Sequence, residues 1–575
     1  MAQLWQERSV SRSKRCWFSG AMLLVVGMLV LYYVQESSWN PFPPLEWKSN
    51  NAPVFVNRWN GSGSQNGTIV LIAQTNATTT DSTNKLLTAP IMKTNKTVKV
   101  TSYATTNSQT NKAVFSLGVY SKQLQFSSVP GKNLSVGDIL RVGISAKDKQ
   151  GNVTTNVGDY FRPSIVNVKT KSGAVGVITD HQNGTYTATY RLLWAGQVNI
   201  IVKLVHPRQA IDVIERTVRK HPVDKIMFVK RYLIGKAKID TRCNVDPAIF
   251  NTTTPVCNYS DPHAGVRWYC EKATNISCNT SGYHGRLRTS VKLLQKGEEK
   301  LFGRGMNGVK KAISGSSSKI DVTKGPDPLA NRTRCIPGLP TPQISGFYDR
   351  GAWNSLVCHN RHFVNQSEWR TCLRGKTLHL MGDSTIRQWY EHLVKIFHLT
   401  DSPLPDAIHQ TGPLLARDTV DNITVKYRSH GPPLRCAWTR TFHLQYIANV
   451  IDEIEGGPNN GITLWAHFTS YPVDIYRERM EAIRAAVQRL HQRSPETLVV
   501  IKSANTRNGN ELLAGDWLAH QMDLLMMEMF EGMNIVLIDA WEMTTAQQWH
   551  GDAIHPASDI IIQELEYLCS FVCPL

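Results

Sequence analysis

The chain has 575 residues, of which 41% are hydrophobic and only 19% charged. This length allows about two to four folded units, and this composition excludes a disordered polyelectrolyte. The 64 Lys and Arg residues exceed the 45 Asp and Glu residues, and the formal net charge of +19 favours an anionic partner: nucleic acid, a phosphorylated cofactor, a membrane surface or an acidic glycan.

The first predicted element is a membrane anchor. Residues 17–34 contain no charge and follow the basic segment Arg8–Arg15. A helix of this length just spans a bilayer core of about 30 Å, and the basic flank keeps residues 1–16 in the cytoplasm. A cleaved signal peptide, giving a secreted form, is the alternative, but Gln35–Trp39 offers no good small-x-small cleavage site. We therefore expect a single-pass type II membrane protein.

The rest of the chain has the features of a secretory compartment. Ten of the eleven cysteines follow the anchor, an even number that fits five disulfides. Asn-x-Ser/Thr glycosylation sites begin at Asn60, 66, 76, 95, 133, 152, 183, 251, 258, 275, 279, 331, 365 and 422. A luminal location excludes nucleic acid as the partner in spite of the net charge.

A stalk and a β-sandwich are predicted after the anchor. Residues 35–92 are rich in Asn, Thr, Ser and Gly and are expected to be solvated. Within residues 93–290, short segments of alternating polarity separated by Gly and Asn turns predict an antiparallel, Ig-like sandwich. The clearest strands are Val136–Ala146, Asn183–Tyr190 and Gly196–Leu204.

Four cysteines close together end this region. Cys243, Cys257, Cys270 and Cys278 lack the CxxC spacing of zinc sites, so a disulfide-stapled extension is predicted and no metal site is expected. Residues 291–334 are rich in Gly, Ser and Pro and are predicted to be a linker.

Strands and helices alternate in residues 335–575, which predicts a parallel α/β sheet between helical layers. The predicted strands are Thr377–Met381, Thr424–Tyr427, Ile462–Ala466, Leu498–Ile501 and Asn534–Ile538. The predicted helices include Ile386–Phe397, Ile475–Gln492 and Leu518–Phe530. Chemistry in such sheets lies at the carboxyl ends of the strands.

The segment Gly382-Asp383-Ser384 joins a predicted strand to a predicted helix. This turn would place the Ser384 hydroxyl at the sheet edge, beside helix amides suited to an oxyanion. A simpler interpretation is that Asp383 or Ser384 only caps the helix. No HExxH zinc motif and no G-x-S-x-G motif occurs in the chain.

Asp552 and His555 lie three residues apart near the end of the domain. His555 could take the proton of Ser384 while Asp552 orients the imidazole, which together would form a catalytic triad. A D-x-x-H match alone is weak, but its combination with strand–GDS–helix favours a serine triad.

Other residues are less certain members of the predicted site. Gly431, His467 and Asn505 are candidates for completing the oxyanion hole, with His467 equally an ordinary packed histidine. Arg387, one turn after Ser384, could bind a carboxylate or phosphate or could simply be solvated.

The GDS and DxxH segments resemble the SGNH/GDSL-type hydrolase fold, specifically its PC-esterase branch. Gly382–Gln388 is similar to the motif of the luminal sialic-acid O-acetyltransferase and of the plant trichome-birefringence-like polysaccharide O-acetyltransferases. The sandwich and cysteine cluster resemble neurexophilin, and the combination resembles the neurexophilin and PC-esterase domain family. The resemblance implies a three-layer SGNH-type domain. This chain departs from the resemblance at the third sequence block of SGNH enzymes, here residues 464–468, where His467 stands in place of the expected Asn.

The resemblance implies a Golgi-membrane serine O-acetyltransferase that uses acetyl-CoA as donor, without a bound cofactor, and acts on sialylated or other acidic glycans. Two alternatives stay open. The same triad could hydrolyse glycan acetyl esters, or the chain could be a non-catalytic glycoprotein whose sandwich binds a cell-surface protein.

Overall fold

The computed structural model describes residues 121–126, 133–147, 158–220, 226–288, 292–302, 312–313, 319–402, 404–436, 438–456, 460–463, 468–507, 511–513, 515–551 and 554–573. All described residues belong to one unit of the chain, Gln109–Leu575. The predicted anchor and stalk lie outside the described residues. Within the described residues, no helix has both the length and the apolar character needed to cross a membrane.

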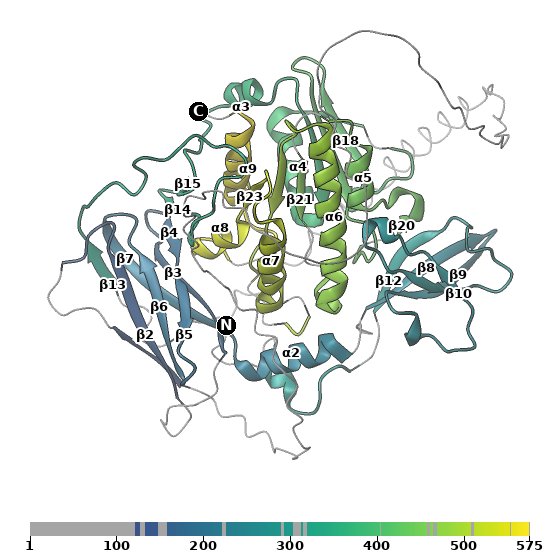
Figure 1. The fold of residues 1–575 in the computed structure, drawn as a ribbon, viewed down its shortest axis with the longest axis horizontal. Coiled ribbons are helices and arrows are strands. Elements are labelled where there is room, and N and C mark those ends of the chain that lie inside the picture. Colours follow the sequence, from purple (N-terminus) through teal and green to yellow (C-terminus); the bar gives the residue numbers. More distant parts are fainter. Residues whose placement is uncertain are drawn as a thin grey trace, which may run out of the picture. The chain divides into compact units, whose positions relative to one another are not determined.

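Two antiparallel sheets face each other in the first part of this unit (Figure 1). One has the order β1-β2-β6-β5, formed by β1 (Ser121–Phe126), β2 (Ile139–Lys147), β5 (Val177–Asp180) and β6 (Thr185–Arg191). The other has the order β13-β7-β3-β4-β14-β15, formed by β3 (Tyr160–Asn167), β4 (Ser172–Val175), β7 (Gly196–His206), β13 (Lys319–Val322), β14 (Gly346–Asp349) and β15 (Ala352–Ser355).

The alternation of polarity along these strands determines which side chains form the core. Every second residue of β2 is buried, including Val142 and Ile144, and these side chains pack with Tyr186 of β6 and with Ile200 and Val202 of β7. Successive strand residues point to opposite faces, so period-two sequences bury one face against the partner sheet. Strands β2, β6 and β7 confirm the three predicted strands.

Segments from later in the chain complete the second sheet. β13 comes from residues 291–334, predicted to be a linker, and pairs with β7. The β14–β15 hairpin comes from the predicted second domain, and Tyr348 pairs with Gly173 of β4. These later segments pair there because β7 and β4 would otherwise present open sheet edges with unpaired backbone groups.

A third sheet has the order β10-β11-β9-β8-β12-β20. It contains β8 (Ile226–Ile234), β9 (Ala237–Asn244), β10 (Val256–Asn258), β11 (Tyr269–Glu271), β12 (Tyr283–Arg288) and β20 (Thr439–Arg440). Its last strand, β20, is contributed by the α/β part of the chain, where Thr439 pairs with His284. This sheet therefore joins two segments that are far apart in sequence.

The fourth sheet carries the Gly-Asp-Ser turn. Its order is β17-β18-β19-β16-β21-β22-β23, with β16 (Thr377–Gly382), β17 (Thr400–Asp401), β18 (Leu414–Asp418), β19 (Ile423–Ser429), β21 (Asn460–Thr463), β22 (Val499–Lys502) and β23 (Val536–Ile538). All five predicted strands are found in it and are mutually parallel. Numbered along the chain, these five have the doubly wound order 2-1-3-4-5. The sheet is mixed, because β17 and β18 pair antiparallel at its edge.

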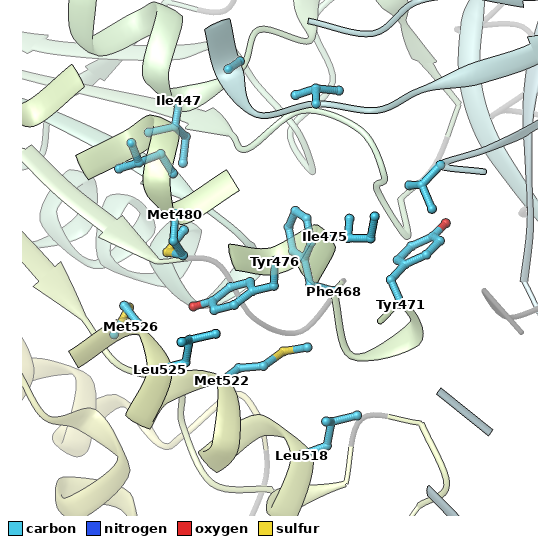
Figure 2. Packing of buried hydrophobic residues seen from close by; sticks show 14 of the residues in the cluster. Ile447, Phe468, Tyr471, Ile475, Tyr476, Met480, Leu518, Met522, Leu525 and Met526 are labelled. Atoms are coloured by element: carbon cyan, nitrogen blue, oxygen red, sulfur yellow. The ribbon is translucent and has the colours of Figure 1, made fainter. Parts of the chain in front are cut away.

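Helices cover both faces of this sheet (Figure 1). They are α3 (Gln366–Leu373), α4 (Ser384–Phe397) and α9 (Ser558–Val572) on one face, and α5 (Ile447–Glu453), α6 (Val473–Arg493) and α7 (Asp516–Phe530) on the other. In β22, Val499 and Ile501 pack with the second group whereas Val500 packs with the first. Figure 2 shows Tyr476 and Met480 of α6 with Met522, Leu525 and Met526 of α7 in this core.

The prediction of five disulfides is wrong by one. The structure pairs Cys243 with Cys270, Cys257 with Cys278, Cys335 with Cys358, and Cys372 with Cys573. The other two described cysteines, Cys436 and Cys569, are unbonded. They belong to different places in the fold, since Cys569 lies in the buried face of α9 and Cys436 follows β19. An even count alone could not show that separation.

Candidate active site

Ser384 is the first residue of α4, directly after the carboxyl end of β16. Asp383 is the helix cap: its Oδ1 accepts hydrogen bonds from the Thr385 amide and the Thr385 hydroxyl, both at 2.8 Å. The predicted cap is therefore confirmed, with Asp383 in that role. Because Asp383 satisfies this end of the helix, the Ser384 hydroxyl is available for another partner.

That partner is His555. The Ser384 Oγ lies 2.7 Å from His555 Nε2, a distance at which the imidazole can accept the hydroxyl proton. The two residues are brought together from opposite ends of the α/β segment, because His555 precedes α9 and α9 packs against α4. Strand β16 lies between β19 and β21, where the chain order of the doubly wound sheet reverses. Ligands bind at this kind of position in open α/β sheets.

A buried polar side chain, that of Asn505, holds the loop that carries His555. The Asn505 side-chain amide donates to the Ile554 carbonyl at 3.4 Å, and its Oδ1 accepts from Lys502 Nζ at 2.6 Å. Both Asn505 and Lys502 are almost fully buried. The residue next to His555 is therefore tied to the end of β22.

The environment of His555 favours the neutral imidazole. Partial burial lowers the pKa of His555 below its usual value, while the nearby Asp383 carboxylate acts in the opposite direction and raises it. Asp383 is 2% exposed, and its second oxygen, Oδ2, is buried without a hydrogen-bond partner among the described residues. A neutral imidazole can accept a proton, so the lowered pKa suits a general base.

Ser384 and His555 lie in a cavity of about 600 Å³. Its wall is formed by Arg286, Asp383, Ser384, Arg387, Gln410, Thr411, Tyr427, Ser429, Leu434, Arg435, Cys436, Trp438 and His555. Three arginines and one aspartate give this wall a positive balance of fixed charge. The cavity is large enough for part of a small organic substrate, and its charge favours an anionic one.

The structure separates the predicted site residues into three groups. Ser384, His555 and Arg387 line the cavity, although Arg387 is already bound to Glu391 Oε1 at 2.9 Å and to the Gln410 carbonyl at 3.0 Å. Gly431 and Asn505 are absent from the cavity wall formed by the described residues. Asp552 and His467 lie outside the described residues, so their roles stay predictions.

Each of the two displaced oxyanion candidates has another role. Gly431 has φ of +77°, and a Cβ there would lie 2.5 Å from Cδ1 of the Tyr446 ring, so the position needs glycine for packing. Asn505 uses its amide to hold the Ile554 carbonyl. The Thr385 amide is occupied by Asp383 Oδ1, so the other amides at the start of α4 are the candidate donors for an oxyanion.

Sequence reasoning missed Arg286, Arg435 and Trp438. Arg435 and Trp438 follow β19, and their position after the carboxyl end of a parallel strand is a signal that could have found them. Arg286 lies on β12 of the third sheet. No local pattern in the sequence connects that strand with Ser384.

These features define a multi-sheet protein whose described part combines facing antiparallel sheets with an α/β sheet that carries a serine–histidine pair. Two family models match the chain: NXPE family member 4-like, C-terminal domain, over residues 353–573, and neurexophilin over residues 93–298. These two matches support the neurexophilin/NXPE family, which fits a neurexophilin-like glycoprotein. We call residues 93–298 the neurexophilin segment below.

Among solved structures, the chain is similar to the crystal structure of invasin, a bacterial integrin-binding protein. The identity is 12%, the match covers 55% of this chain and 56% of that chain, and the TM-score is 0.12. The match thus spans only a little more than half of the invasin chain. A likeness at this TM-score carries no argument about fold or function.

Proposed function

We propose that the protein is a Golgi-luminal serine-dependent O-acetyltransferase, which moves an acetyl group from acetyl-CoA to a glycan hydroxyl. The proposed acceptor is the sialic acid of glycoproteins. The observation that carries the proposal is the 2.7 Å contact between Ser384 Oγ and His555 Nε2 in a positively charged cavity. The 2-1-3-4-5 strand order and the position of Ser384 after the first parallel strand support an SGNH-type domain.

The reaction has two acyl-transfer steps. Ser384 Oγ attacks the thioester carbonyl while His555 takes its proton, and the C–S bond breaks as the thiolate leaves and is protonated by His555. The glycan hydroxyl then attacks the acyl-serine, His555 accepts the hydroxyl proton, and Ser384 recovers a proton as its ester bond breaks. Helix amides at the start of α4 stabilise the oxyanion of each step. Asp552 is proposed to orient His555.

Transfer is favoured over hydrolysis by two features. A type II anchor, as the sequence predicts, would hold the domain in the Golgi beside newly made glycans. The arginines in the cavity suit both a phosphorylated donor and an acidic acceptor. An esterase would use the same serine and histidine with water as acceptor, so the direction of the reaction has to be measured.

The test is a profile of sialic-acid O-acetylation after the full-length chain is expressed in cells with low endogenous acetylation. We expect O-acetylation to rise, and the rise to be lost in Ser384→Ala and His555→Ala. Ser402→Ala, which changes an exposed serine of the same domain, is the matched control and should behave as wild type. A fall with the wild-type chain would indicate an esterase. An unchanged profile, with no labelling of Ser384 by a fluorophosphonate, would indicate a non-catalytic glycoprotein.

The pH dependence of the activity should report the pKa of His555. Because burial lowers that pKa, the acidic limb of kcat/KM for ester cleavage is expected below pH 6.5, the ordinary value for histidine. Asp383→Asn should move the limb further down, because it removes a carboxylate that favours the imidazolium, while asparagine can still cap α4. A pH–rate profile checks both. An acidic limb above pH 6.5, or an upward shift in Asp383→Asn, would contradict this assignment of the base.

A further inference from the structure

One charged side chain of the cavity wall, that of Arg435, has no ion-pair partner among the residues that the structure describes. Arg435 makes no hydrogen bond or ion pair with any residue that the structure describes, and its Nε and Nη2 atoms are buried. Burial lowers the pKa of Arg435 to about 10, so the side chain stays protonated at neutral pH. An unpaired buried guanidinium is costly, because it has lost its hydration without gaining a partner.

Among the described residues, the two arginines whose whole side chains are buried, Arg162 and Arg479, both have partners. Arg162 donates to Asp516 at 2.5 Å, and Arg479 donates to the His430 and Pro432 carbonyls at 3.0 and 2.9 Å. The negative charge of Glu511 acts on Arg435 from a distance, but the Glu511 carboxylate already forms an ion pair with Arg507 at 3.1 Å. Nε is also buried without a hydrogen bond in Arg162, Arg479 and Arg484, but among the described arginines Arg435 has two such atoms, Nε and Nη2, and it lines the cavity of Ser384.

The main chain around Arg435 is held against the neurexophilin segment. His284 Nε2 lies 3.2 Å from the Leu434 amide nitrogen and 3.1 Å from the Leu434 carbonyl oxygen, and its tautomer determines which of the two it bonds. The ring of Trp438 lies against Gly285, where a Cβ would come within 2.4 Å of it, and the Arg231 guanidinium stacks on the same ring at 3.6 Å. These contacts fix the wall of the cavity that carries Arg435.

The neurexophilin segment also supplies a charge of its own. Arg286 is an exposed residue of β12 and lines the same cavity as Arg435 and Ser384. Arg387, by contrast, is neutralised locally by Glu391. Among the described residues of the wall, Asp383 supplies the one carboxylate, and its Oδ1 is used to cap α4. Two arginines without an acidic partner in the wall therefore remain for a ligand.

We propose that Arg435 and Arg286 form a subsite that binds the anionic group of the substrate, a carboxylate or a phosphate, beside Ser384. The guanidinium fork matches both groups, and a desolvated arginine gains more from such a pair than a solvated one. This inference rests on the proposed function for the identity of the substrate. It makes the neurexophilin segment part of the substrate site, in addition to any partner that its other surfaces bind.

Binding can be tested without catalysis. In the full-length Ser384→Ala protein, the dissociation constants of N-acetylneuraminic acid and of coenzyme A are measured by calorimetry, with neutral N-acetylmannosamine for comparison. We expect at least one of the two anions to bind, and Arg435→Gln to weaken it roughly 10- to 100-fold, the range of a charge-assisted hydrogen bond. Arg435→Lys should recover only part of the loss, since lysine keeps the charge but not the fork.

The two anions distinguish the acceptor from the donor. A loss confined to N-acetylneuraminic acid assigns the subsite to the acceptor carboxylate, and a loss confined to coenzyme A assigns it to the donor phosphates. Arg286→Gln should weaken the same anion, whereas Arg350→Gln, at an arginine 87% exposed and outside the cavity, should not. The proposal is overturned if neither anion binds, or if Arg435→Gln leaves both constants unchanged. Failure of the proposed function would appear separately, as a wild-type protein that binds the anion but never acylates Ser384.

Discussion

Ser384→Ala is expected to reduce the turnover of acyl transfer by about 10³-fold or more, because the covalent route through the acyl-serine is lost. The fold should be unaffected, since Asp383 caps α4 and the Ser384 hydroxyl bonds to His555 on the cavity wall. The free energy of unfolding should change by less than about 0.5 kcal/mol. Steady-state kinetics with a purified chain and urea unfolding measure the two quantities.

The same experiment can show that Ser384 and His555 act as a unit. His555→Ala should lower turnover to nearly the same extent, and the double variant should be little worse than either single variant. If Ser384 and His555 contributed independently, the fold reductions in turnover of the two single variants would multiply in the double variant. Ser402→Ala is the control for a serine change that leaves the site intact. Retention of more than a tenth of the wild-type turnover in Ser384→Ala would exclude Ser384 as the nucleophile.

The second large effect concerns the disulfide between Cys372 and Cys573. It joins α3 to the end of α9 and closes a loop with a sequence separation of 201. Chain entropy predicts that a cross-link of this length stabilises the fold by roughly 5 kcal/mol. The double variant Cys372→Ala/Cys573→Ala should lose most of this stability, and activity should fall with it because α9 follows the loop of His555.

A short-loop disulfide in the same unit is the matched control. Cys335 and Cys358 have a sequence separation of 23, so the corresponding double variant should lose about 2 kcal/mol less. Urea unfolding of both variants under identical conditions gives the comparison. An equal or larger loss for Cys335→Ala/Cys358→Ala would show that local packing, and not the length of the closed loop, determines the effect.

Local sequence patterns predicted the parts of the fold that depend on local physics. The strand–turn–helix at Ser384 follows from an apolar run, a glycine and a capping aspartate, and the structure has β16, Asp383 and α4 in those places. The predicted helices Ile475–Gln492 and Leu518–Phe530 correspond to α6 and α7, because their apolar faces repeat with helical spacing. The Ser384–His555 contact was expected from the order of the motifs.

Features that depend on distant segments were not predictable in this way. The β14–β15 hairpin joins a sheet from another part of the chain, and its four-residue strands carry no signal of that partner. Cys436 and Cys569 are unbonded because of their places in the fold, which an even count of cysteines cannot reveal. Arg286 lies on β12, which pairs with β20 of the α/β part of the chain, and no local sequence pattern indicates this long-range pairing.

The most direct test of the central claim is the mass of the peptide that contains Ser384, after the purified full-length chain is mixed with acetyl-CoA and rapidly quenched. We predict one acetyl group on Ser384, formed more slowly in His555→Ala and absent in Ser384→Ala. Addition of a sialylated acceptor should remove the group from the wild-type peptide. No acetylation of Ser384, or acetylation that Ser384→Ala does not abolish, would contradict the account.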